Sequence, residues 1–220
     1  MIEPHNSIPH EIRTIQSHYD YTIYWLLIEK KGKEIYHPKF KLHEEDTTTI
    51  LQLLIYFLQD APMAQKYKID LRKGIVLTGP VGCGKTSLMR LMNQVLSTNH
   101  QHMMRACREI AFEFATQGFE VIQRYTRGSF NQYTEQTVAY CFDDLGLEPV
   151  VQHYGNICNV MAEILLSRYD FFIRYKMLTH ITTNLNSQEI EDRYGSRVRS
   201  RCREMFNLVS FNTDSVDKRS

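Results

Sequence analysis

The chain has 220 residues, of which 43% are hydrophobic and 23% are charged, and its formal net charge is +1. This length suits a domain that buries its core without disulfides or a structural metal, and the near-neutral charge excludes a global basic field, so any nucleic-acid contact must come from a local patch. Five cysteines without metal-like spacing, no signal segment and no long apolar run predict a soluble cytoplasmic protein without a membrane partner.

The first part of the chain gives weak signals for secondary structure. Residues 19–29 are aromatic and apolar, which indicates a segment that packs into a core. Gly32 within residues 30–33 favours a turn. Between residues 48 and 59 apolar side chains recur at helical spacing, and we expect Ala61-Pro62 to end that helix.

From residue 74 onward, short apolar runs alternate with helical patterns. The run 74–78 ends in a glycine-rich loop and predicts a buried strand. Further strands are predicted at 103–107, 138–142, 177–183 and 208–211, and helices at 85–96, 109–117, 159–173 and 193–206. Strands that alternate with helices are typical of an α/β fold, in which helices cover both faces of a parallel sheet.

Residues 79–86 read GPVGCGKT and match the phosphate-loop pattern G-x-x-x-x-G-K-[ST]. Glycines let successive backbone N–H groups wrap a phosphate chain, and the dipole of the following helix favours the anion. A chance match is disfavoured because a strand precedes the loop and an amphipathic helix follows it. We expect Lys85 to reach the β- and γ-phosphates and Thr86 to bind Mg²⁺. The predicted ATP-binding residues are Gly79, Pro80, Val81, Gly82, Cys83, Gly84, Lys85, Thr86 and Ser87.

A pair of carboxylates follows the apolar run 138–142. In a phosphate-loop ATPase the strand beside the first one ends in an aspartate that holds the Mg²⁺ shell, a role that falls to Asp143. Asp144 is the candidate general base, which orients the attacking water and accepts a proton. The alternative is an ordinary surface turn before Gly146, but the position after a buried strand favours the catalytic interpretation.

Two further polar groups have open interpretations. Asn184 ends a predicted strand, where it could contact the γ-phosphate or the attacking water, or cap the next helix. Five arginines follow within eleven residues: Arg193, Arg197, Arg199, Arg201 and Arg203. On one helix Arg193, Arg197 and Arg201 would share a face and repel one another. A neighbouring subunit's nucleotide, a nucleic-acid backbone or local carboxylates (Glu189, Glu191 and Glu204) could compensate; a solvated basic face is the alternative.

These motifs, in their order, resemble the AAA+ ATPases of the DnaC/IstB type, which are helicase loaders and transposase helper ATPases. The resemblance covers roughly residues 70–219. It rests on KGIVLTGPVGCGKTSLMRLM, CFDDLG, LSRYDFF, HITTNL and YGSRVRSRCREMFNLVSF.

The resemblance implies a fold, a set of roles and a set of partners. The expected fold is a five-stranded parallel sheet in the order 5-1-4-3-2 with a minimal or absent lid, in which 66–220 is the ATPase domain and 1–65 a mainly helical, partner-binding extension. Asn184 matches the family's sensor-1 position, and Arg201, or else Arg197, its arginine finger. Arg168 matches a family arginine whose role the sequence leaves open. The implied partners are further copies of the chain, a replicative helicase or transposase-like protein, and single-stranded DNA.

The leading hypothesis is therefore a loader or remodelling ATPase that hydrolyses ATP between subunits, with weak turnover in isolation. A small-molecule kinase is a second hypothesis, since it shares the phosphate loop, although only residues 123–134 could form its lid. A third is a binding module whose nucleotide acts as a switch with little hydrolysis.

Overall fold

The computed structural model describes residues 8–95, 101–130, 136–212, 215, 217 and 218. The chain divides into two compact units, each assembled from separate stretches of sequence. The helical unit comprises residues 1–71, 80–101 and 209–220, and the sheet unit comprises residues 72–79 and 102–208. The phosphate loop thus begins in the sheet unit, at Gly79, and continues in the helical unit.

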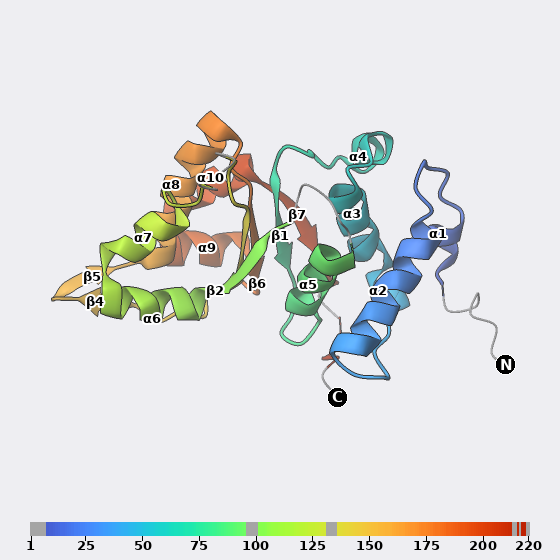
Figure 1. Ribbon diagram of the computed structural model, residues 1–220, viewed down its shortest axis with the longest axis horizontal. Helices are drawn as coiled ribbons and strands as arrows, with labels where there is room; N and C mark the ends of the chain where they lie inside the picture. The colour runs from blue at the N-terminus through green and yellow to red at the C-terminus, as the bar shows by residue number, and fades with distance from the viewer. Residues whose placement is uncertain (1–7, 96–100, 131–135, 213–214, 216, 219–220) are drawn as a thin grey trace. The chain divides into compact units, whose positions relative to one another are not determined.

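A five-stranded sheet forms the centre of the sheet unit, and its order is β2-β3-β6-β1-β7. Strands β1, β2, β6 and β7 of this sheet are labelled in Figure 1. The strands are β1 (Gly74–Thr78), β2 (Met103–Ala106), β3 (Tyr140–Leu145), β6 (Thr179–Thr183) and β7 (Phe206–Ser210). Read as the first to fifth strands of the sheet, they give the expected order 5-1-4-3-2, and the predicted five-stranded parallel sheet is confirmed. Parallel pairing places the carboxyl ends of β1, β3 and β6 at one edge.

Helices and a small hairpin complete the sheet unit. The helices are α6 (Cys107–Gln117), α7 (Phe119–Tyr125), α8 (Val160–Tyr175), α9 (Ser187–Tyr194) and α10 (Ser196–Met205); the hairpin consists of β4 (Val151–His153) and β5 (Asn156–Cys158). Apolar side chains from α6, α7, α8 and α10 form one buried cluster with β3 and β6. The proposed kinase lid at 123–134 is in part the end of α7, and residues 131–135 lie outside the described residues.

The predicted single helix over 193–206 is wrong, because the helix is interrupted at Gly195. This glycine has a φ of 89°, which side-chain-bearing residues rarely adopt, and it separates α9 from α10. Arg193 therefore lies on α9, whereas Arg197 and Arg201 lie on α10. The three arginines do not form one continuous helical row.

Arg168 ties four segments of the sheet unit together from a fully buried position on α8. Its Nε donates to the Thr179 hydroxyl at 2.7 Å, and its terminal nitrogens donate to the carbonyls of Tyr125, Val138 and Leu178 at 2.8, 3.1 and 2.7 Å. Burial lowers the pKa of the guanidinium to about 9. The structure thus gives Arg168 an architectural role that the sequence left open.

The helical unit contains the N-terminal helices and the helix of the phosphate loop. Its elements are α1 (His10–Arg13), α2 (Tyr21–Ile35), η2 (Glu44–Asp46), α3 (Thr47–Leu58), α4 (Ala61–Tyr67) and α5 (Lys85–Val95). Helix α5 packs against α2 and α3, so the phosphate-loop helix and the N-terminal helices share one core. None of the helices formed by the described residues is both long and apolar enough to span a membrane.

Two local predictions in this unit are wrong. Gly32 does not form a turn but lies inside α2, where a Cβ atom would approach the Phe40 ring to 2.2 Å. The glycine is thus needed for close packing rather than for a turn. Ala61-Pro62 does not end a helix but begins α4, because proline is well tolerated in a first helical turn and the Asp60 side chain caps that turn. The preceding helix ends at Leu58, since Gln59 is left-handed.

Candidate functional site

The phosphate loop has the backbone geometry that its glycines predict. Strand β1 ends at Thr78, which pairs with Thr183 of β6, and α5 begins at Lys85. Gly82 and Gly84 have φ angles of 81° and 101°, and a side chain is disfavoured at both positions. The predicted strand–loop–helix is therefore present, with N–H groups of a helix N-terminus at the end of the loop.

Lys85 lies against the backbone of its own loop. It is buried, and its ammonium group donates to the Pro80 carbonyl at 2.8 Å and contacts the Cys83 sulfur at 3.9 Å. Burial raises the pKa of the Cys83 thiol, which favours its neutral and less reactive form. A positively charged side chain held this close to backbone amides forms a suitable place for phosphate oxygens.

In the sheet unit, Thr182 contacts both residues of the acidic motif, the carboxylate of Asp143 and the backbone of Asp144. Its hydroxyl donates to Asp143 Oδ1 at 2.6 Å and accepts from the Asp144 N–H at 2.9 Å. Strand β3 continues through both aspartates instead of ending at residue 142, and its register with β6 shifts between Phe142 and Leu145. Asp144 has a φ of 55°, so this irregularity turns its side chain out of the regular alternation of the strand.

Asn184 follows directly after β6. Its Oδ1 atom is buried and has no hydrogen-bond partner among the described residues. The neighbouring Thr183 hydroxyl is engaged, since it donates to the Leu145 carbonyl at 2.7 Å and accepts from the Leu185 N–H at 3.0 Å. A helix cap is instead provided by Asn186, which begins α9 with a capping box. The capping alternative for Asn184 is therefore wrong.

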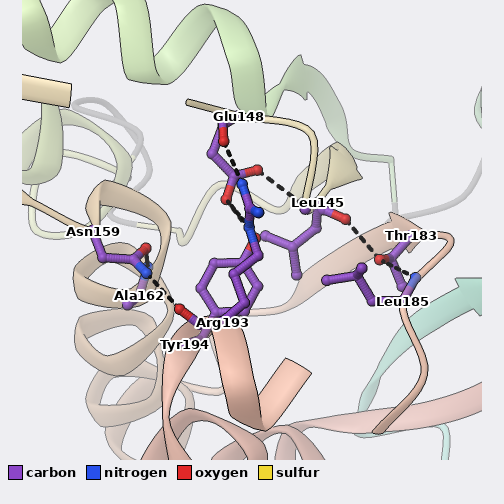
Figure 2. A network of polar contacts seen from close by, with 9 residues as sticks. Leu145, Glu148, Asn159, Ala162, Thr183, Leu185, Arg193 and Tyr194 are labelled. Carbon is purple, nitrogen blue, oxygen red and sulfur yellow. Dashed lines mark hydrogen bonds and ion pairs between the residues drawn. The ribbon is translucent and has the colours of Figure 1, made fainter. Parts of the chain in front are cut away.

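Figure 2 shows a polar network between the turn after β3 and the junction of α9 with α10. The buried carboxylate of Glu148 accepts from the Gly146 N–H at 2.9 Å and from the Tyr194 hydroxyl, and it forms an ion pair with Arg193 at 3.7 Å. Arg193 also donates to the Glu148 carbonyl, and Asn159 donates to the Arg193 carbonyl at 2.9 Å. Burial is the main cause that raises the pKa of the Tyr194 hydroxyl, and the nearby Glu148 carboxylate raises it further. Sequence reasoning missed Glu148, although its place shortly after the two aspartates was a signal.

The arginines after Asn184 have different surroundings. Arg199 pairs with Glu191, and Arg201 stacks on the Tyr169 ring at 4.2 Å while donating to Glu204 at 3.2 Å. Local carboxylates thus compensate part of the cluster, as one of the interpretations predicted. Arg197 is exposed, and its side chain has no hydrogen bond or ion pair within the described part of the chain.

The residues present suit a magnesium nucleotide. Each unit contributes groups of its own. In the helical unit the loop has amides and a lysine. In the sheet unit Asp143 has an oriented carboxylate, Asp144 has a left-handed backbone and Asn184 has an unpartnered amide oxygen. No cluster of three or more histidine, cysteine or acidic side chains that could hold a metal by itself is found in the described ranges.

Comparison with solved structures identifies proteins of the same fold. The crystal structure of the DnaC helicase loader is 18% identical and has a TM-score of 0.54; the match covers 86% of this chain and 99% of that one. The crystal structure of DnaI is 17% identical and has a TM-score of 0.52, with 78% and 87% covered. No model of a protein family and no curated protein sequence matches the chain. At these identities the likeness establishes the fold, which is the one that the sequence resemblance implied.

Proposed function

We propose that this chain is an ATPase that uses ATP and Mg²⁺ to load or remodel a partner protein in DNA replication or transposition. The observation that carries the proposal is the phosphate loop, a complete G-x-x-x-x-G-K-T sequence in a strand–loop–helix with a buried lysine. Further support comes from the fold, since one of the similar structures is described as a helicase loader.

Each predicted site residue receives a specific role in this proposal. Lys85 and the loop amides bind the β- and γ-phosphates, and Thr86 and Asp143 hold Mg²⁺. Asp144 accepts a proton from the attacking water, which Asn184 orients through its free oxygen. The left-handed backbone at Asp144 supports its separate role, because it takes this residue out of the strand alternation that would otherwise set the direction of its side chain.

Hydrolysis between subunits requires an arginine that can reach a neighbouring nucleotide. We assign this role to Arg197 in preference to Arg201. Arg201 is already held by Tyr169 and Glu204, so inserting it elsewhere would break a stacking contact and an ion pair. Arg197 lies one turn earlier on α10 and has no such contacts to lose.

Partners are proposed by analogy with the helicase loader. They are further copies of this chain, which assemble when ATP is bound, and a replicative helicase or transposase-like protein. Single-stranded DNA is a third candidate, and its phosphates would contact exposed arginines of α10. A backbone contact of this kind predicts that affinity for DNA falls steeply with salt, so a flat salt response would exclude it.

The decisive experiment measures ATP binding and phosphate release for the wild-type protein and for Lys85→Ala. We expect the wild type to bind ATP and to release phosphate faster at high protein concentration, with or without single-stranded DNA, and the variant to lose binding. Lys66→Ala, on the surface helix α4, is the matched control. Unchanged ATP affinity in Lys85→Ala would remove the proposal. Phosphorylation of a nucleoside or nucleotide would favour the kinase, and binding without phosphate release would favour the switch.

A further inference from the structure

Near the end of the described chain, Lys218 contacts the backbone of the phosphate loop. Its N–H donates to the Gly82 carbonyl at 3.1 Å, and its ammonium group donates to the Cys83 carbonyl at 3.2 Å. All three residues belong to the helical unit. Two successive peptide groups of the loop are therefore fixed by one residue, which lies 135 positions after Cys83 in the chain.

These contacts determine the direction in which two loop amides point. A trans peptide group is planar, so its N–H is directed opposite to its C=O. The Gly82 carbonyl shares its peptide group with the Cys83 N–H, and the Cys83 carbonyl shares its group with the Gly84 N–H. Because Lys218 binds both carbonyls, it turns the N–H groups of Cys83 and Gly84 away from itself. These N–H groups belong to the part of the loop that wraps phosphate.

Lys218 is itself firmly held. Its ammonium group forms an ion pair with Asp46, a buried residue at the end of η2 directly before α3, and lies 5.1 Å from the centre of the Phe211 ring. Only 14% of its side chain is exposed. Next to it, the Asp217 side chain occupies the space into which a Cβ of Gly82 would project, at 2.2 Å. Asp217 thus approaches the loop as closely as the glycine at position 82 permits.

We propose that Lys218 is a positioning residue of the nucleotide site, which holds the phosphate loop from outside so that the Cys83 and Gly84 amides face the phosphates. The inference rests on the proposed binding of ATP by this loop. It also gives the C-terminal segment a function in nucleotide affinity, and it links the loop to the N-terminal helices through Asp46.

The test compares Lys218→Met, Lys218→Arg and a control, Lys33→Met, which removes a surface lysine paired with Glu29 on α2. We expect Lys218→Met to weaken ATP and ADP binding about tenfold, since a charged hydrogen bond to the loop is lost. Lys218→Arg should recover most of this loss, and Lys33→Met should bind like the wild type. Amide hydrogen exchange in residues 79–90 of the folded, nucleotide-free protein should be faster in Lys218→Met alone.

A second variant separates positioning from charge balance, because Lys218→Met also leaves Asp46 without its cation. In the double variant Asp46→Asn/Lys218→Met the buried charge is removed as well, and the weakened ATP binding should persist. Recovery of wild-type affinity in the double variant would overturn the inference, as would unchanged affinity in Lys218→Met. Failure of the wild type to bind ATP would instead remove the proposed function, and with it this inference.

Discussion

The Thr182 hydroxyl lies 2.6 Å from Asp143 Oδ1 and donates its proton to that carboxylate. The same oxygen accepts from the Asp144 N–H at 2.9 Å, so one side chain on β6 fixes the carboxylate of the first aspartate and the backbone of the second. Because a hydroxyl has a single proton, its direction is determined by this pair of contacts. The Asp143 carboxylate is thereby held in one orientation, which is what a hydrogen-bonding partner would provide to a carboxylate in the proposed Mg²⁺ site.

Replacement of Thr182 by Val removes the hydroxyl and nearly preserves the shape of the side chain. We expect Mg²⁺-dependent ATP turnover to fall by about 10- to 100-fold, which is typical when a group behind a metal-binding residue is lost. Thr182→Ser, which keeps the hydroxyl, should remain close to the wild type. Thr116→Val, on the exposed side of α6, controls for the general loss of a hydroxyl. Equal turnover in Thr182→Val and the wild type would show that Asp143 needs no such orientation.

We predict different effects on ATP turnover when Arg197 and Arg201 are replaced by alanine. If Arg197 acts on a neighbouring subunit's nucleotide, Arg197→Ala should keep its ATP affinity and lose stimulated turnover by about 10³-fold, the lower end of known arginine-finger effects. Arg201→Ala should mainly lose its contacts with Tyr169 and Glu204, and we expect a small change in turnover. Mixing Arg197→Ala with a Lys85→Ala chain should restore activity only if the arginine acts between subunits. The reverse ranking of the two alanine variants would transfer the role to Arg201.

Glu148 should matter for both stability and turnover, because it joins the turn after the aspartates to the helices that hold the arginines (Figure 2). Glu148→Gln weakens its contacts with Tyr194 and Arg193, and we expect a loss of about 1–3 kcal/mol in the free energy of unfolding. ATP affinity should be retained while turnover falls. Glu120→Gln, on the exposed face of α7, is the matched control. Wild-type stability and turnover in Glu148→Gln would show that this network contributes to neither property.

Arg168 is expected to be among the most sensitive positions for stability. Arg168→Met leaves the buried carbonyls of Tyr125, Val138 and Leu178 without their donor, and about 3–5 kcal/mol should be lost in urea unfolding. Arg168→Lys should not restore it, since an ammonium group cannot span the same set of acceptors. Arg174→Met, exposed on the same helix, should change stability by less than about 0.5 kcal/mol. A loss below that of the control would contradict the architectural role.

Local patterns in the sequence were sufficient for the strand–loop–helix around Lys85 and for most of the strands and helices after it. Phosphate loops depend on adjacent residues, because glycine conformations and a helix start are determined within a few positions. The resemblance added the order of the strands, which the sheet has. The break at Gly195 was missed because the arginine-rich stretch is helical on both sides, and only the backbone angle of one glycine divides it.

Other features depend on contacts between residues that are distant in sequence, and only the tertiary structure decided them. Thr182 and Asp143 lie 39 positions apart, and Glu148 and Tyr194 lie 46 apart. Nothing in the local pattern of either partner reveals such a contact, because the pairing of strands and the packing of helices create it. The sequence by itself therefore predicted which groups would bind phosphate and magnesium, whereas the tertiary structure decided which side chains contact these groups, which arginines are already engaged and which residue contacts the backbone of the loop.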